Sequence, residues 1–289
     1  MIFKIKREKR MVTIAIIISV IILFSAFCWW SNNGLMVTEI EYKNNEIPKE
    51  FDGYRIVQLS DLHNKEFGDN QKRLVEKVKE ANPDIIIMTG DMIDNYDDDM
   101  TPTIDLIQEA VKIAPCYFVT GNHEVDMIHW EPLKKEIEGM GVPVLDSKVV
   151  ELKKGDSTIE LLGLKDANFI TADEHKYADP IQSDLDELVK GKSEFKILLA
   201  HRPEYFEWYS KPNSKIDLVF SGHAHGGQIR IPFINQGVVA PGQGLFPKLT
   251  EGITTKNDTS IIVSRGLGNS IIPLRVFNRP EVVVVTLRS

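Results

Sequence analysis

Along most of the chain, short apolar runs alternate with longer segments whose apolar residues recur at helical spacing. The apolar runs predict strands, and the periodic segments predict amphipathic helices. The run at 84–88 is continuously apolar, which is typical of a strand covered on both faces. We therefore expect an α/β domain. The expected strands are 37–42, 54–59, 84–88, 116–119, 195–200 and 216–220, and the expected helices are 69–81, 101–112, 131–138 and 181–190.

Two further parts of the chain have a β pattern. Residues 149–152 and 158–162 flank a Gly-Asp pair, which predicts a hairpin in an antiparallel or mixed second sheet. The C-terminal part, residues 229–289, has short apolar runs at 260–263 and 282–287 among glycines and prolines. We expect this part to complete the second sheet and to form one rim of a cleft.

The first thirty residues have a different composition. Residues 11–30 contain no charge, and at about 1.5 Å per residue a helix of this length spans about 30 Å, the thickness of a bilayer core. The basic flank before this run predicts a cytoplasmic N-terminus and an extracytoplasmic catalytic domain. The expected organisation is a basic cytoplasmic flank at 1–10, a transmembrane anchor at 11–30, a linker at 31–36 and a catalytic domain at 37–289.

A cleaved signal peptide is the alternative interpretation of this N-terminal segment. Its apolar core is usually about 7–15 residues long and precedes a cleavage site with small residues at both flanking positions. The run here is longer, and its nearest approximation to such a site, Ala26-Phe27-Cys28, is poor. The sequence favours a retained single-pass anchor in the cell membrane.

Length and charge limit the function of the remaining chain. About 250 residues suit one large α/β domain better than two small ones. The first ten residues carry a net charge of +4, which leaves −12 for the rest of a chain whose total is −8. An acidic domain repels nucleic-acid backbones, so we expect no nucleic-acid partner. Two cysteines, 28 and 116, provide no disulfide framework.

Five of the expected strands end in side chains that can bind a metal ion. In open α/β sheets, ligands bind outside the carboxyl ends of the strands, so these side chains are expected to meet at one site. The candidates are Asp61, His63, Asp91, Asn122, His201, His223 and His225.

The last strand end carries the pair His223 and His225. In an extended segment, residues i and i+2 point the same way, so this pair is expected to present two imidazoles to one small volume. A His-x-His pair on its own is as often a surface turn. The other strand ends favour the metal-site interpretation.

The candidate ligands are carboxylates, an amide oxygen and imidazoles, without a thiolate. This set favours a divalent ion such as Mn, Fe, Zn, Co or Ni. Seven candidates exceed the need of one catalytic ion with an open position, so we expect two ions. One carboxylate can offer an oxygen to each of two ions, and such a pair clamps both sides of a displacement at phosphorus.

These motifs resemble those of the calcineurin-like metallophosphoesterases over about residues 37–289. The matching blocks, in the same order, are Asp61-x-His63, Gly90-Asp91, Gly121-Asn122-His123-Glu124, His201 and Gly222-His223-Ala224-His225. The ending Gly-His-x-His-Gly-Gly-Gln is similar to that of the bacterial membrane-associated phosphodiesterase branch. The resemblance implies a four-layer αββα sandwich with a dinuclear metal centre at the carboxyl ends of the strands.

The resemblance also implies a role for each matching residue. One ion would be held by Asp61, His63, Asp91 and His225, and the other by Asp91, Asn122, His201 and His223. His123 would be catalytic without binding an ion, because the matching family residue stabilises charge or protonates the leaving oxygen. Arg202, Arg230 and Arg265 are candidate substrate contacts, with surface ion pairs as the alternative. Glu124 is expected to belong to the start of a helix.

We therefore expect a metal-dependent phosphoesterase, active as a monomer, whose nucleophile is a hydroxide that bridges the two ions. The short linker keeps the domain close to the bilayer, which favours a phosphodiester or pyrophosphate substrate that is lipid-linked or confined to the cell envelope. The glycine-rich, apolar segments 242–247 and 266–273 can line an apolar groove beside the ions, with ordinary packing between short strands as the alternative. The alternative function is a membrane-anchored metal-binding interaction module without turnover.

Overall fold

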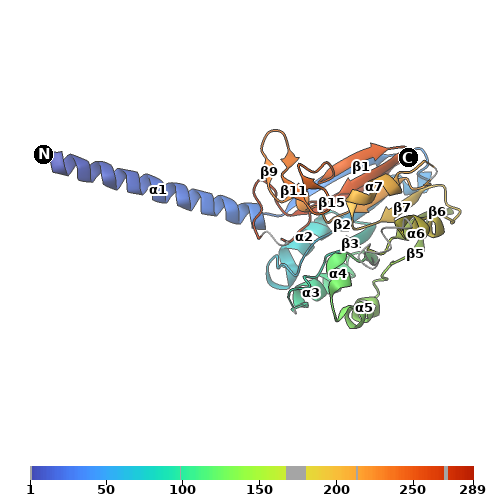
Figure 1. Ribbon diagram of the computed structural model, residues 1–289. Helices are drawn as coiled ribbons and strands as arrows, with labels where there is room; N and C mark the ends of the chain where they lie inside the picture. The colour runs from blue at the N-terminus through green and yellow to red at the C-terminus, as the bar shows by residue number, and fades with distance from the viewer. Residues whose placement is uncertain (1, 98, 167–179, 213, 270–272) are drawn as a thin grey trace.

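The computed structural model describes residues 2–97, 99–166, 180–212, 214–269 and 273–289. A long N-terminal helix, α1 (Ile2–Asn33), leads into a domain built around two sheets (Figure 1). Residues 270–272 of the candidate groove segment lie outside the described residues.

The first sheet has five strands in the order β1-β15-β2-β3-β4. Strands β2, β3 and β4 are parallel, whereas β15 pairs antiparallel with β2 and parallel with β1. Their bounds are β1 (Met36–Lys43), β2 (Arg55–Leu59), β3 (Ile85–Thr89), β4 (Cys116–Val119) and β15 (Glu281–Arg288). The expected edge strand at 37–42 is confirmed as β1.

The second sheet has six strands in the order β13-β14-β8-β7-β6-β5. Strands β14, β8, β7 and β6 are parallel to one another, and the two edge strands are antiparallel to their neighbours. Their bounds are β5 (Lys148–Lys154), β6 (Ser157–Gly163), β7 (Lys196–Leu199), β8 (Leu218–Ser221), β13 (Gly252–Lys256) and β14 (Thr259–Val263). The expected hairpin is confirmed as β5 and β6.

Helices cover the outer face of each sheet (Figure 1). The longer ones are α2 (Lys72–Glu80), α3 (Thr101–Ala110) and α5 (Trp130–Gly139) on the first sheet, and α6 (Pro180–Leu188) on the second, where the short α7 (Phe206–Tyr209) also packs. A separate core lies between the sheets, where Ile56 and Ile87 of the first sheet join Ile197 and Phe220 of the second. The implied αββα sandwich is thus confirmed.

Short elements complete the chain. They are the helix α4 (Asn122–Asp126) and two small ribbons, β9 (Arg230–Ile231) with β10 (Gln236–Gly237), and β11 (Val239–Ala240) with β12 (Gly244–Leu245). The helix expected at 69–81 starts only at Lys72, because Asn70 and Gln71 have positive φ angles. The buried Gln71 side chain instead binds the backbone of Phe67 and Pro102.

Strand β15 lies elsewhere than its sequence predicted. We expected residues 282–287 in the second sheet, and this prediction is wrong, because β15 lies inside the first sheet. Its side chains enter two cores: Val282 and Val284 pack under the outer helices, and Val283 and Val285 pack between the sheets. A strand that is apolar on both faces needs cover on both faces. Residues 252–263 do complete the second sheet, as β13 and β14.

The strand directions place the end of α1 beside the carboxyl ends of strands β2, β3 and β4 in the first sheet. Strand β1 starts opposite Glu281, and β15 runs antiparallel to β2, with Val283 opposite Gln58. The first residues of β1 therefore lie at the same end of the sheet as the last residues of β2. Helix α1 continues to Asn33, so only Gly34 and Leu35 separate it from β1, in place of the longer linker expected at 31–36. Its 9–33 part is long and apolar enough to cross a bilayer.

Candidate metal centre

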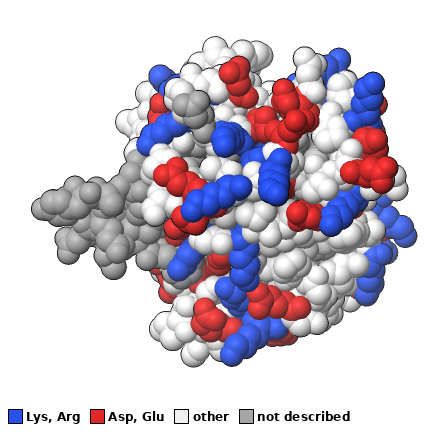
Figure 2. Space-filling view, turned by 90° about the vertical axis from the view of Figure 1, so that its right-hand side faces the viewer, with Lys and Arg blue, Asp and Glu red and all other residues white. Residues whose placement is uncertain are grey.

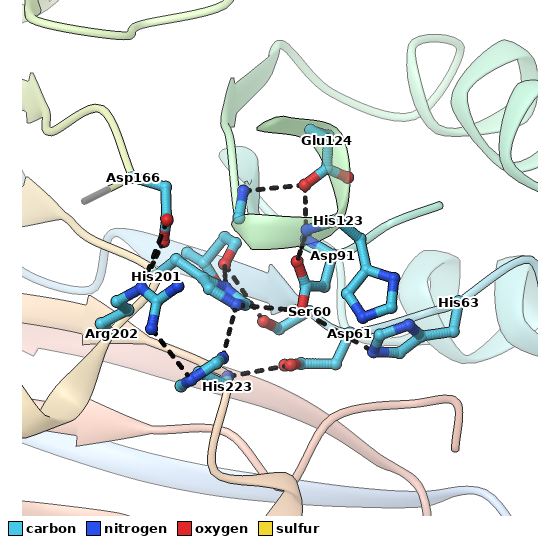
Figure 3. A network of polar contacts seen from close by, with 12 residues as sticks. Ser60, Asp61, His63, Asp91, His123, Glu124, Asp166, His201, Arg202 and His223 are labelled. Atoms are coloured by element: carbon cyan, nitrogen blue, oxygen red, sulfur yellow. Dashed lines mark hydrogen bonds and ion pairs between the residues drawn. The ribbon is translucent and has the colours of Figure 1, made fainter. Parts of the chain in front are cut away.

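The candidate ligands follow the carboxyl ends of β2, β3, β4, β7 and β8. The structure brings six of the seven, all except Asn122, into groups that could hold a metal ion, and Figure 3 shows five of these six: Asp61, His63, Asp91, His201 and His223. Five of these residues have the left-handed backbone conformation that favours glycine. Their φ angles are 52° for Asp61, 48° for His63, 52° for Asp91, 62° for His223 and 46° for His225. Such strain collects at functional sites, where the surrounding structure enforces it.

One group of side chains that can hold a divalent ion consists of Asp61, His63 and His225. The Nε2 atoms of the two imidazoles lie 3.2 Å apart, and His225 Nε2 lies 3.4 Å from Asp61 Oδ1. Oδ1 also accepts a hydrogen bond from the backbone N–H of His223 (2.8 Å). The other oxygen, Oδ2, is buried and has no hydrogen-bond partner among the described residues.

A second group consists of Asp91, His201 and His223. His201 Nε2 lies 3.1 Å from His223 Nδ1 and 3.1 Å from Asp91 Oδ2. The other nitrogen of His201, Nδ1, lies 2.8 Å from the carbonyl oxygen of Thr89, which fixes the ring and leaves Nε2 directed at the centre.

Asp91 connects the two groups through a single oxygen. Its Oδ2 contacts His201 and lies 3.9 Å from His63 Nε2, while its Oδ1 accepts the backbone N–H of His123 (2.9 Å). A carboxylate oxygen facing both groups is the arrangement that two neighbouring ions need.

The His223–His225 pair differs from the expectation. Both residues lie beyond β8, in a left-handed turn and the short helix that follows it, and their imidazoles face different groups. Both imidazoles reach the shared centre as expected, but the extended conformation predicted for this segment is wrong, because the positive φ angles of His223 and His225 turn the chain.

The donor atoms fit divalent ions. In each group two ring nitrogens face each other at 3.1–3.2 Å, and a cation bound to both would stabilise this arrangement. Two nitrogen ligands that each lie about 2.0–2.1 Å from one ion are a similar distance apart. The buried Oδ1 of Asn122, in the first turn of α4, also lacks a hydrogen-bond partner among the described residues. Each of these atoms is an acceptor that a cation would satisfy.

Burial and the nearby carboxylates shift the pKa values of the imidazoles in opposite directions. Burial lowers the pKa of His63 to about 3, so its imidazole is neutral and able to bind a metal. Burial acts in the same direction on His201, but Asp91 and Asp61 outweigh it and raise its pKa to about 10. In the absence of an ion, a proton on His201 therefore balances the carboxylates. A bound cation replaces that proton.

Glu124 positions two of the strand ends, although its sequence context indicated only a helix start. It lies in the first turn of α4, and its carboxylate accepts the backbone N–H groups of Asp91 (2.8 Å), Met92 (2.8 Å) and Gly121 (2.7 Å). This fully buried side chain thereby joins the turn after β3 to the turn after β4.

His123 lies beside the two groups, and with His63 and Asp91 it makes a third set of side chains that could hold an ion. Its ring is 4.5 Å from that of His63, centroid to centroid, and nearly perpendicular to it. The backbone N–H of Asn95 donates to its Nδ1 (3.2 Å). In the neutral imidazole the proton is then on Nε2.

The three candidate arginines lie in different surroundings. Arg202 contacts the centre, with Nη1 3.4 Å from His223 Nε2, and its Nε pairs with Asp166 (2.9 Å). Arg230 is buried; it donates to the Gly226 carbonyl (2.7 Å) and pairs with Glu251. Arg265 pairs with the same Glu251. Of the three, Arg202 contacts a member of the two groups.

Comparison with known proteins identifies the family. Residues 54–227, which include all eight residues predicted to bind the ions or act in catalysis, match the family described as calcineurin-like phosphoesterase. The chain is 32% identical over 257 residues to the uncharacterized metallophosphoesterase YkuE of Bacillus subtilis, covering 87% of this chain and 85% of that protein. It is 30% identical over 275 residues to the uncharacterized metallophosphoesterase Cj0846 of Campylobacter jejuni, covering 94% of this chain and 68% of the relative.

A third relative, from Danio rerio, is a transmembrane protein with metallophosphoesterase domain, 25% identical over 87% of this chain. The match spans 57% of that protein, so this chain corresponds to little more than half of it. The family match spans more than half of this chain, and it coincides with the segment that builds the two ligand groups. The chain therefore belongs to the calcineurin-like phosphoesterase family and is a metal-dependent hydrolase of phosphoesters.

Proposed function

We propose that this protein hydrolyses a phosphodiester or pyrophosphate with two divalent ions, one in each ligand group. Asp61, His63, Asp91 and His225 hold one ion, and Asp91, Asn122, His201 and His223 hold the other. The observation that carries this proposal is the position of Asp91 Oδ2, which faces both groups. The oxygen and nitrogen donors favour Mn, Fe, Zn, Co or Ni.

The bound ions supply an activated water as nucleophile and neutralise charge on the phosphate. The side chains of the protein determine where these events occur. Asp91 sets the separation of the two groups, and Glu124 and Thr89 hold Asp91 and His201 in place. His123, with its proton on Nε2, protonates the leaving oxygen or stabilises charge on the phosphate.

The substrate is lipid-linked or confined to the cell envelope. Two observations support this class. The anchor enters at the edge of the first sheet that carries the ligand groups, so the centre lies on the side of the domain nearest the bilayer. A groove of about 850 Å³ extends from Glu204, whose Oε1 is 3.5 Å from His223 Nε2, to the exposed Leu245 and Phe246. These two residues belong to the segment 242–247, one of the two candidates for lining an apolar groove.

The test combines metal analysis with kinetics of the full-length protein in mixed micelles. We expect two metal equivalents per chain and hydrolysis of a generic aryl phosphodiester. A polyprenyl-type or phospholipid diester should give a higher kcat/KM than a soluble cyclic nucleotide. A preference of more than about tenfold for the nucleotide, or ~1.4 kcal/mol, would contradict the substrate class without contradicting the phosphoesterase activity.

A further inference from the structure

The last turn of the anchor helix contacts the loops beside the metal centre. Asn32 makes a two-point contact with the backbone of Arg275: its Oδ1 accepts the N–H (2.9 Å), and its Nδ2 donates to the carbonyl (3.2 Å). The same Oδ1 accepts a hydrogen bond from Asn269 Nδ2 (3.2 Å). One amide side chain of α1 therefore binds both Asn269 and Arg275.

Arg275 is the largest fully buried side chain of the domain. Its Nε donates to the Gly268 carbonyl (3.0 Å) and its Nη2 lies 3.4 Å from His225 Nδ1, but its Nη1 has no hydrogen-bond partner among the described residues. A buried, incompletely bonded guanidinium costs stability. Because Arg275 lies next to the candidate metal ligand His225, its side chain can hold that ligand in position as well as fill the core.

All three residues of one ligand group connect to Asn32 in this way. Arg275, held by Asn32, packs against the ring of His225, with Nη2 3.4 Å from Nδ1. When Nε2 of His225 binds an ion, Nδ1 carries the ring proton, so Arg275 positions this ring by packing and not by a hydrogen bond. Gly268, whose carbonyl accepts from Arg275, donates its N–H to the Asp61 carbonyl (2.5 Å).

The third connection runs through Lys65. It lies two residues after His63, and its ammonium donates to the Asn32 carbonyl. Because a helix ends in unpaired carbonyls, a cation at this position also stabilises the end of α1.

The other ligand group is supported from inside the domain. Asp91 is held by Glu124 of α4, and His201 is held by the Thr89 carbonyl at the end of β3. These supports lie on the first sheet and its connecting turns. A shift of the anchor relative to the domain therefore acts directly on the first group, and it reaches the second group indirectly, through the hydrogen bond from the His223 N–H to Asp61 Oδ1.

We infer that the last turn of the membrane anchor is a positioning element for the group formed by Asp61, His63 and His225. This inference rests on the proposed function, in which that group holds one of the two ions. Asn32 and Arg275 do not touch the ion or the substrate; they fix the loops that orient its ligands. The affinity of this one ion thus depends on how the anchor is seated against the domain.

The test measures Mn²⁺ affinity in full-length protein reconstituted in nanodiscs, with each ligand group isolated in turn. The variant His201→Ala/His223→Ala keeps the first group, and His63→Ala/His225→Ala keeps the second. Adding Asn32→Ala to the first background should weaken Mn²⁺ binding about 10–100-fold, as is usual when a residue supporting a ligand is lost. Adding it to the second should have a much smaller effect on the affinity.

The matched control is Arg279→Ala. Arg279 also seats the anchor, through hydrogen bonds to the carbonyls of Gly34 and Leu35 (both 2.7 Å) and a stacking contact with Trp30, but it does not touch the ligand loops. Arg279→Ala should lower the unfolding temperature without a selective change in Mn²⁺ affinity.

Equal weakening in both backgrounds, or none in the first, overturns the inference. If Asn32→Ala fails to fold, Asn32→Gln, which displaces the same amide by one methylene, decides by the same comparison. If the protein with both ligand groups intact binds Mn²⁺ at both groups but hydrolyses no phosphodiester, the proposed function fails. The effect of Asn32→Ala on Mn²⁺ affinity is measured separately, so the two failures are distinguishable.

Discussion

At the scale of single residues, the centre combines strained backbone with buried, incompletely satisfied side chains. A left-handed conformation costs an ordinary residue about 1–2 kcal/mol, and five of the candidate ligands adopt it. Asp61 and Asn122 also each bury an oxygen without a hydrogen-bond partner among the described residues. Bound ions recover part of this cost, because they satisfy those oxygens and bind the folded chain alone. Metal removal is therefore expected to lower stability as well as activity.

Replacement of His123 tests catalysis apart from metal binding. His123→Ala should lower kcat by about 10²–10⁴-fold with metal content unchanged, because its proposed role is proton donation or charge stabilisation. Substrates with very good leaving groups should be affected least. His129→Ala, an exposed histidine on the following turn, is the matched control and should behave as wild type. Loss of one metal equivalent in His123→Ala would show that His123 is a ligand.

Replacement of Asp91 tests the shared oxygen. Asp91→Ala should remove activity more completely than loss of His63 or His201, because the Asp91 Oδ2 atom faces both groups. Metal analysis by mass spectrometry, measured together with kcat, checks this expectation. Near-normal turnover with a single ion per chain would exclude the dinuclear mechanism.

The sequence indicates the ligands better than the residues that support them. Asp61, Asp91 and His201 stand out because each follows a strand, and strand ends converge. Arg275 gives no such signal, because its contacts with Asn32 join residues 243 positions apart in the chain. Glu124 was expected only at a helix start, since its bonds to the turn after β3 depend on the approach of two strands.

At the scale of elements, the turns after the strands need close backbone approach. A Cβ at Gly222 would overlap Ser60 Oγ and Asp61 Oδ2, and one at Gly121 would overlap Asp91. These glycines let separate strand ends meet in one small volume.

The continuous apolar pattern of β15 predicted a strand correctly but not its sheet, because both faces of either sheet are covered.

Gly222→Ala tests this close approach. The added methyl must displace Asp61 or the His223 turn, so metal content and kcat should both fall. Gly139→Ala is the control: no atom lies within 4 Å of the added Cβ at the end of α5, so we expect unchanged metal content and equal or slightly higher stability. Full metal content in Gly222→Ala would contradict the geometry.

Glu124→Gln tests the link between the turns after β3 and β4. The amide brings an N–H₂ group against backbone donors that the carboxylate accepts, so the free energy of unfolding should fall by about 1–3 kcal/mol. Denaturant unfolding measures this change. The exposed Glu131, in the first turn of α5, provides the control Glu131→Gln, for which no comparable loss is expected.

At the scale of the whole molecule, the anchor and the centre share one side of the domain. On the face turned away from α1, Lys and Arg side chains are interspersed with Asp and Glu side chains (Figure 2). Such a surface suits water better than a bilayer. The chain direction of β1 could not be read from its own residues, since it depends on pairing with β15 at the other end of the chain.

The orientation across the membrane is tested in intact cells by cysteine labelling. In a background with Cys28 and Cys116 replaced by serine, Val149→Cys places a thiol on an exposed position of β5, far from the anchor (Figure 1). Arg10→Cys places one in the basic flank. The positive-inside rule predicts that a membrane-impermeant maleimide labels position 149 in intact cells and position 10 only after permeabilisation. The reverse pattern would place the metal centre in the cytoplasm and restrict its substrates to the inner leaflet.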